Sequence, residues 1–230
     1  MKKGINHFSR TLEILQLTKI NMEKPEAWYK IIDQSDADSL SEKLEEIIRN
    51  SKNLYADRLK EIYAIEQEKF NLRDTKENIR AIFKKEESYN LGREKLLGLS
   101  FSELQKIELV TSPLVRIYEA DWKWFLRYPF QNGFDLKKVL ATKKEDHYFL
   151  LEKTGTFDDL LDSNISDFPL IEYQYFLLQL FEKSKKVEEA LEDFYKIFEI
   201  ANEKAMKNLI MLTEKIMKEL IFRRFIVQSD

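Results

Sequence analysis

The sequence contains no cysteine and very little glycine or proline. Its 230 residues include five glycines and four prolines. The absence of cysteine excludes disulfide frameworks, thiolate zinc sites and cysteine nucleophiles. Few glycines and prolines leave few tight turns, which favours helices over β-sandwiches and barrels. We therefore predict an all-α fold in a reducing compartment, with the cytoplasm as the default location.

Long apolar runs are also missing. No stretch reaches the roughly 18 consecutive apolar residues from which a membrane-spanning helix is read. The segment Met1 to Ile20 carries charges throughout and lacks the apolar core and small-residue cleavage site of a secretory signal. We expect neither a transmembrane segment nor a secretory signal.

Charge of one sign is not in excess. The 38 basic and 41 acidic residues give a formal net charge of −3, although 34% of the chain is charged. A nucleic-acid-binding domain usually has a basic surface, so this balance disfavours that class. A hydrophobic content of 43% with 13% aromatic residues indicates a folded chain.

Recognisable catalytic patterns are absent. The only two histidines, His7 and His147, have no second histidine or carboxylate at metal-ligand spacing. The chain contains no glycine-rich phosphate loop and no serine-nucleophile motif. Paired carboxylates are most simply explained as solvated helix faces. We predict no catalytic residue, no metal site and no cofactor.

What the chain does contain is long stretches with helical periodicity. The stretch 185–227 has neither glycine nor proline, and its apolar residues recur every three or four positions. Additional apolar residues, including Ile210 and Met211, widen this stripe, so we expect the helix to be covered on more than one side. A second stretch, 39–87, begins with a capping box of Ser39 and Glu42. The segment Asn71 to Asp74 is either a kink in it or a break.

The two long helices are expected to lie antiparallel in an elongated bundle, bridged by shorter helices. The expected divisions are 1–34, 35–98, 99–168 and 169–230. Short helices are predicted at 5–20, from the capping box of Ser100 with Glu103, and from Ser112–Pro113 to a point before Pro129. Helical turns are predicted at 134–140 and 156–165, and a helix at 170–183. Turns are predicted near Asn90 and Gly92 and near Gly98. At most one short strand is expected, near 147–151.

Two groups of aromatic residues are candidate partner-binding sites. Trp124 and Tyr128 are four residues apart and fall on a different face of the predicted helix from Trp122, close to Arg127. Aromatics with arginine outside the core stripe are typical of binding hot spots. Plain burial is the alternative. The stretch Pro169–Phe181 is either an enclosed core helix or a face that docks on another subunit. In the second case Tyr173, Phe176 and Phe181 would contact the partner.

Arg223 and Arg224 are weak candidates for nucleic-acid contact. Both stand in the last turns of the predicted helix, where they would also complement its dipole. We regard nucleic acid as an unlikely partner.

One short run resembles a known family. Residues 78–86, which begin with Asn, Ile, Arg and Ala, resemble the Asn-Ile-Arg repeats of the all-helical C or d subunit of rotary V-type ATPases, and residues 138–145 match the run loosely. The resemblance covers a small part of the chain, so we assign no family from it.

The leading hypothesis is therefore a non-catalytic adaptor or structural subunit that binds other proteins or itself. A helical enzyme or ligand-binding protein with a site near Trp124, Arg127 and Tyr128 is the first alternative. A nucleic-acid-binding accessory protein is the second.

Overall fold

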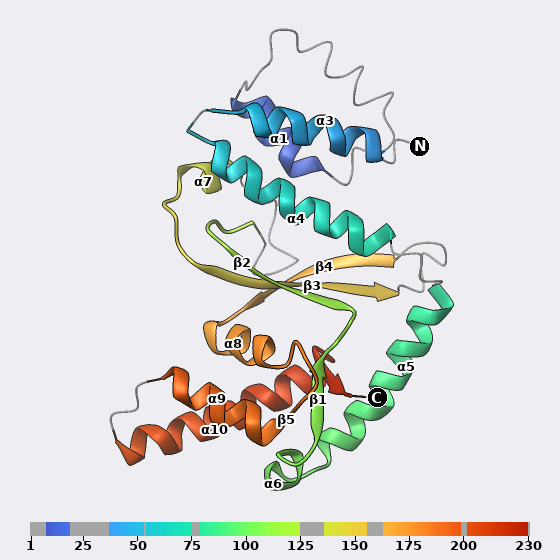
Figure 1. Cartoon of the computed structure of the whole chain (residues 1–230), viewed down its shortest axis with the longest axis vertical. Coiled ribbons are helices and arrows are strands. Elements are labelled where there is room, and N and C mark those ends of the chain that lie inside the picture. Colours follow the sequence, from blue (N-terminus) through green and yellow to red (C-terminus); the bar gives the residue numbers. More distant parts are fainter. Residues whose placement is uncertain are drawn as a thin grey trace. The chain divides into compact units, whose positions relative to one another are not determined.

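The computed structural model describes residues 8–18, 37–52, 54–74, 79–124, 136–155, 163–198 and 202–229 (Figure 1). The chain forms two compact units. Unit 1 combines Met1–Thr75 with Ala120–His147, and unit 2 combines Lys76–Glu119 with Tyr148–Asp230. Each unit is thus built from segments that are not consecutive in the sequence.

Helices and strands both occur in the described residues. The helices are α1 (Ser9–Thr18), α3 (Ala37–Asn50), α4 (Ala56–Asp74), α5 (Ile79–Leu97), α6 (Phe101–Leu104), α7 (Leu136–Ala141), α8 (Glu172–Leu180), α9 (Val187–Ile197) and α10 (Glu203–Phe222). The strands are β1 (Glu108–Thr111), β2 (Val115–Ala120), β3 (His147–Gly155), β4 (Ser163–Leu170), β5 (Lys185–Lys186) and β6 (Ile226–Gln228). They form two three-stranded antiparallel sheets, ordered β5-β1-β6 and β2-β3-β4. The predicted all-α bundle is therefore wrong.

The predicted long helix over 185–227 is divided into β5, α9, α10 and β6. Asn202 starts α10 as its N-cap, because its side chain accepts a hydrogen bond of 3.0 Å from the backbone N–H of Ala205. The helix ends where Arg224 takes a left-handed conformation with φ of 65°. The N–H of Phe225 donates to the carbonyl of Leu220, and that of Arg224 to Ile221, both at 2.9 Å. These two bonds make a Schellman motif, which turns the chain out of the helix and into β6.

The predicted long helix over 39–87 is likewise not continuous. It is replaced by α3, α4 and the first part of α5. At the end of α3, the Ser51 hydroxyl bonds the carbonyl of Ile47 at 2.8 Å and the chain leaves the helix. The segment Asn71 to Asp74 belongs to α4, and residues 75–78 lie outside the described residues. The turn predicted near Asn90 and Gly92 is instead the interior of α5.

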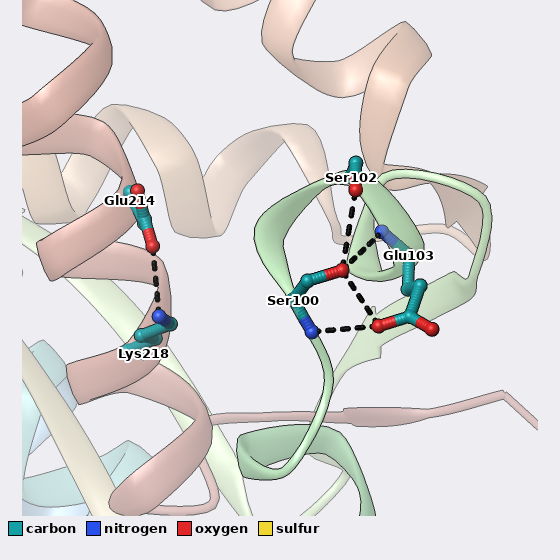
Figure 2. A network of polar contacts seen from close by, with 5 residues as sticks. All are labelled: Ser100, Ser102, Glu103, Glu214 and Lys218. Atoms are coloured by element: carbon teal, nitrogen blue, oxygen red, sulfur yellow. Dashed lines mark hydrogen bonds and ion pairs between the residues drawn. The ribbon is translucent and has the colours of Figure 1, made fainter.

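The capping box of Ser100 and Glu103 is confirmed (Figure 2). The Glu103 N–H donates to the Ser100 hydroxyl at 3.3 Å, and the Ser100 N–H donates to the Glu103 carboxylate at 2.8 Å. The Ser100 hydroxyl and N–H both donate to the Glu103 carboxylate, so the pKa of Glu103 is lowered. The helix is shorter than expected, since α6 ends at Leu104 and the chain enters β1.

Ser112 and Pro113 do not start a helix. The Ser112 N–H donates to the carbonyl of Phe225 at 2.9 Å, which extends the pairing of β1 with β6. The chain then enters β2 at Val115, so the predicted helix is wrong over the described part up to Trp124. Its spacing of apolar residues fits a strand as well as a helix over this length, because short apolar runs are ambiguous.

The expectation of at most one short strand, near 147–151, is wrong. Residues 147–151 do lie in a strand, but β3 runs from His147 to Gly155 and is one of six strands in the described residues. It pairs antiparallel with β4 in a register that runs from Tyr148 opposite Leu170 to Gly155 opposite Ser163. Pro169 therefore lies in a strand, and α8 begins at Glu172. Of the predicted acidic turn at 156–165, the described residues 163–165 belong to β4. The helical predictions at 5–20 and 134–140 agree with α1 and α7 where residues are described.

Unit 2 has a hydrophobic core in the described part of the chain. Its buried side chains come mainly from β1, α8, α9, the second half of α10 and the turn that follows α10. They include Leu109, Leu177, Leu178, Phe181, Val187, Phe194, Met217, Leu220 and Phe225. None of the described helices is both long and apolar enough to cross a membrane.

Unit 1 is organised by a buried carboxylate at the start of α1. Glu66 of α4 is only 4% exposed and accepts bonds from the N–H groups of Arg10 (2.9 Å) and Thr11 (3.0 Å) and from the Thr11 hydroxyl (2.7 Å). The N–H groups at a helix start have no partner inside the helix, so Glu66 satisfies two of them and complements the helix dipole. Burial raises the pKa of Glu66, although these donors act to lower it.

We predict that Glu66→Gln lowers the unfolding free energy by about 1 to 3 kcal/mol, because a glutamine amide cannot accept all three bonds. The raised pKa adds a pH dependence. The stabilisation linked to Glu66 is complete below the unfolded pKa of 4.5 and is lost as pH rises through the folded pKa. The difference between wild type and variant should thus narrow as pH rises. Urea unfolding at several pH values, followed by circular dichroism, measures both effects.

Glu13→Gln is the matched control, since Glu13 is an exposed residue of α1. It should change the unfolding free energy by less than about 0.5 kcal/mol. Equal effects of the two substitutions would contradict the role given to Glu66.

Candidate partner-binding surfaces

Trp124, a predicted hot-spot residue, is completely buried in unit 1. The Glu61 carboxylate of α4 accepts bonds from the N–H groups of Asp121 (2.7 Å) and Trp122 (3.1 Å) and from the Trp124 indole. The Arg10 guanidinium donates to the carbonyl of Trp124. Glu61 therefore fixes the segment that follows β2 onto α4, and Trp124 serves packing. Arg127 and Tyr128 lie outside the described residues, so a ligand site formed with them stays a prediction.

A shallow hollow of about 480 Å³ lies beside this segment. Its lining includes Asp57, Lys60, Glu61, Asp121 and Lys144, and Lys144 pairs with Asp121 at 2.5 Å. Burial raises the pKa of Glu61, while its three N–H donors act to lower it. Three acids, Asp57, Glu61 and Asp121, face two lysines here, and the described residues contain no cluster suited to a metal ion. We assign this hollow no ligand.

The apolar stretch 169–181 is mostly enclosed. Phe181 is completely buried, whereas Tyr173 and Phe176 are half-buried among other aromatic rings. Tyr173 stacks on Phe198 with ring centres 4.9 Å apart, and Phe176 lies 6.2 Å from Tyr148. Ile171 is the exposed exception, at 52%. These contacts favour an enclosed helix for most of the stretch.

Arg223 and Arg224 make contacts within unit 2. The Arg223 guanidinium bonds Glu219 at 3.2 Å and stacks 4.3 Å from the centre of the Phe168 ring. Arg224 lies 3.7 Å from Glu152, whose pKa is raised by burial although Arg224 acts to lower it. A nucleic-acid phosphate would have to compete with these carboxylates.

The first half of α10 carries three consecutive exposed apolar residues. Leu209, Ile210, Met211 and Leu212 are consecutive, so they point to all sides of a helix with 3.6 residues per turn. Leu209 packs partly against the core. Ile210, Met211 and Leu212 are 38%, 71% and 37% exposed. Sequence periodicity had marked Ile210 and Met211 as widening the stripe, but it could not show which part of the helix is left uncovered.

A second surface, not found from the sequence, lies between α5 and β6. We call this hollow of about 280 Å³ the β6 groove. It is lined by Ser88, Tyr89, Leu91, Gly92, Arg93, Lys95, Leu96 and the segment Ile226–Ser229. A further hollow of about 650 Å³ shares Tyr89, Val227, Gln228 and Ser229 with it and continues over residues 110–113, residues 115–117 and Glu182. The groove depends on strand pairing between distant segments, so no local sequence signal could have found it.

Comparisons with protein-family models, curated proteins and solved structures gave no match for this chain.

Because Glu61 holds Trp124 in place, we predict that Glu61→Gln lowers the unfolding free energy by about 1 to 2 kcal/mol. It should also shift tryptophan emission to longer wavelength as the indole gains water. Asp57→Asn changes another acid of the same hollow, one that binds no indole, and should leave the emission unchanged. Identical spectra for wild type and Glu61→Gln would show that the segment is held by packing alone.

Proposed function

We propose that this protein is a non-catalytic subunit that binds other proteins in a larger assembly. The proposal depends on one observation, the exposed apolar residues Ile210, Met211 and Leu212 in the first half of α10. A helix that is apolar on all sides is normally buried on all sides. Among the described residues, Leu209 packs against the core and Ile210 and Leu212 are partly covered, whereas Met211 is largely uncovered. A partner would cover Met211 and the exposed parts of Ile210 and Leu212.

The surroundings of these residues indicate the chemistry of the partner. Lys204 and Lys207 are exposed on α10, and neither makes an ion pair with any described residue. Further along the helix, by contrast, Lys218 is paired with Glu214 at 2.7 Å (Figure 2). An apolar surface next to unpaired lysines fits an amphipathic helix of another subunit with acidic residues at its border. Met211 adds to this fit, because methionine adapts its shape to a partner surface.

The balance of charge and the contacts of Arg223 and Arg224 favour a protein partner over nucleic acid. Both arginines have carboxylate partners in unit 2. The net charge of −3 offers no long-range attraction for phosphate. Apolar contact, in contrast, is insensitive to this charge.

We predict that Met211→Glu abolishes binding of the partner, because a carboxylate at position 211 would lose its hydration inside an apolar interface. The free energy of unfolding should change by less than about 0.5 kcal/mol, since Met211 is 71% exposed in the free chain. Native affinity purification with quantitative mass spectrometry compares the proteins recovered by wild type and variant. The amount of a reproducible partner that is recovered should be at least about tenfold lower for the variant than for wild type.

Leu54→Glu provides the control, because Leu54 is an apolar residue of unit 1 that is 81% exposed. This variant should recover the same partner as wild type. Recovery of the same proteins in equal amounts by wild type and Met211→Glu would overturn the proposal.

A further inference from the structure

The outer edge of β6 has backbone groups that no residue in the described part of the chain bonds. In the antiparallel pair of β1 with β6, the N–H of Ser112 donates to Phe225 at 2.9 Å and that of Ser229 to Glu108 at 3.2 Å. Hydrogen-bonded and non-hydrogen-bonded pairs alternate along such a ladder. The backbone groups of Ile226 and Gln228 must therefore point away from β1. β6 is the outermost strand of its sheet, and no described residue bonds these groups.

These groups face the β6 groove. Ile226 is only 1% exposed, so its outward N–H and C=O are largely shielded from bulk water. A shielded backbone group without a hydrogen bond carries a free-energy penalty, which another backbone could relieve. Gln228, by contrast, is exposed. At Ile226 the edge is already desolvated, so a strand that binds there would lose less hydration than at a fully open edge.

The groove has room for an extended chain. It has a volume of about 280 Å³ and opens into the neighbouring hollow of about 650 Å³. Gly92 of α5 contributes to this room, because a Cβ atom built on it would meet nothing within 4 Å. An extended peptide could lie along Ile226–Gln228, with alternate side chains directed into the two hollows.

The charge around the groove indicates which peptide fits. The lining of the smaller hollow includes two cations, Arg93 and Lys95, and no carboxylate. Arg93 is held by Glu94 at 2.8 Å and by the carbonyl of Phe222, whereas exposed Lys95 has no partner among the described residues. A peptide with acidic side chains would complement this lining.

We propose that the β6 groove binds an extended acidic peptide of a partner protein, which adds a strand to the edge of β6. The edge supplies backbone donors and acceptors for affinity, and Lys95 and Arg93 select acidic side chains. The groove is separate from the exposed residues of α10, so this site extends the proposed function without depending on Met211.

A synthetic peptide of alternating valine and glutamate, about eight residues long like a typical strand, is the probe. Fluorescence anisotropy measures its binding to the full chain. The same peptide with every backbone amide N-methylated keeps its side chains but loses its donors. It should bind at least about tenfold more weakly, and so should a valine–lysine peptide. Equal binding of the parent and N-methylated peptides would overturn strand addition.

Gly92→Leu tests the location of the site. The leucine side chain enters open space and suits a helix, so the fold should persist while the groove is filled. Binding of the valine–glutamate peptide should fall at least about tenfold. Asn90→Leu is the matched control in α5, because Asn90 does not line either hollow. Lys95→Glu should weaken binding of the valine–glutamate peptide and strengthen binding of the valine–lysine peptide.

Two further measurements distinguish the groove from the α10 surface and from self-association. Met211→Glu should bind the peptide like wild type, so failure of the α10 interface and failure of the groove can be told apart. Sedimentation of wild type and Gly92→Leu tests whether a second copy occupies the edge. A dimer that Gly92→Leu abolishes, together with no peptide binding, would assign the groove to self-association and overturn the proposal.

Discussion

The pairing of β1 with both β5 and β6 is the constraint on which unit 2 depends. β1 lies at Glu108–Thr111, and its partners come from residues 185–186 and 226–228. Bringing such distant segments together costs chain entropy, which is recovered only when the core around Leu109 and Phe225 forms. Helices α8, α9 and α10 lie between these strands in the sequence, so the pairing also fixes where each helix must end.

The turn at Arg224 shows how this constraint acts on single residues. A left-handed conformation is disfavoured for residues with a Cβ atom, by roughly 1 to 2 kcal/mol. Here it is maintained by the two Schellman bonds, by burial of Phe225 against Leu220 and by the ion pair of Arg224 with Glu152. The conformation aims β6 at β1, so the strained backbone is a consequence of the sheet and does not by itself mark a functional site.

Much of the local structure could be predicted from the sequence. The capping box of Ser100 and Glu103 and the strand at His147 depend on neighbouring residues alone, and both were predicted. The break between α9 and α10 was missed, because no glycine or proline marks it and the N-cap Asn202 was read as part of a helix. The pairing of β1 with β5 and β6 could not be predicted at all, since strands of two to four residues carry almost no periodic signal.

Among the candidate surfaces, too, some features can be predicted from the sequence and others depend on the fold. Met211 belongs to an excess of apolar residues that the sequence shows directly, although only the fold decides that it stays outside the core. Trp124 and Phe181 were also candidate partner-binding residues on sequence grounds, yet the fold buries both side chains completely. The β6 groove has no sequence signature, because it is formed by an outermost strand next to a helix from elsewhere in the chain.

The groove also follows from how sheet edges are protected. An outer strand must be covered to prevent uncontrolled pairing, and α5 packs beside β6. The cover has a gap where Gly92, a poor helix residue, stands in place of a side chain that would close it. Alanine or leucine at this position would favour the helix and reduce the hollow. Local stability therefore gives no reason for glycine here, whereas room for a pairing strand does.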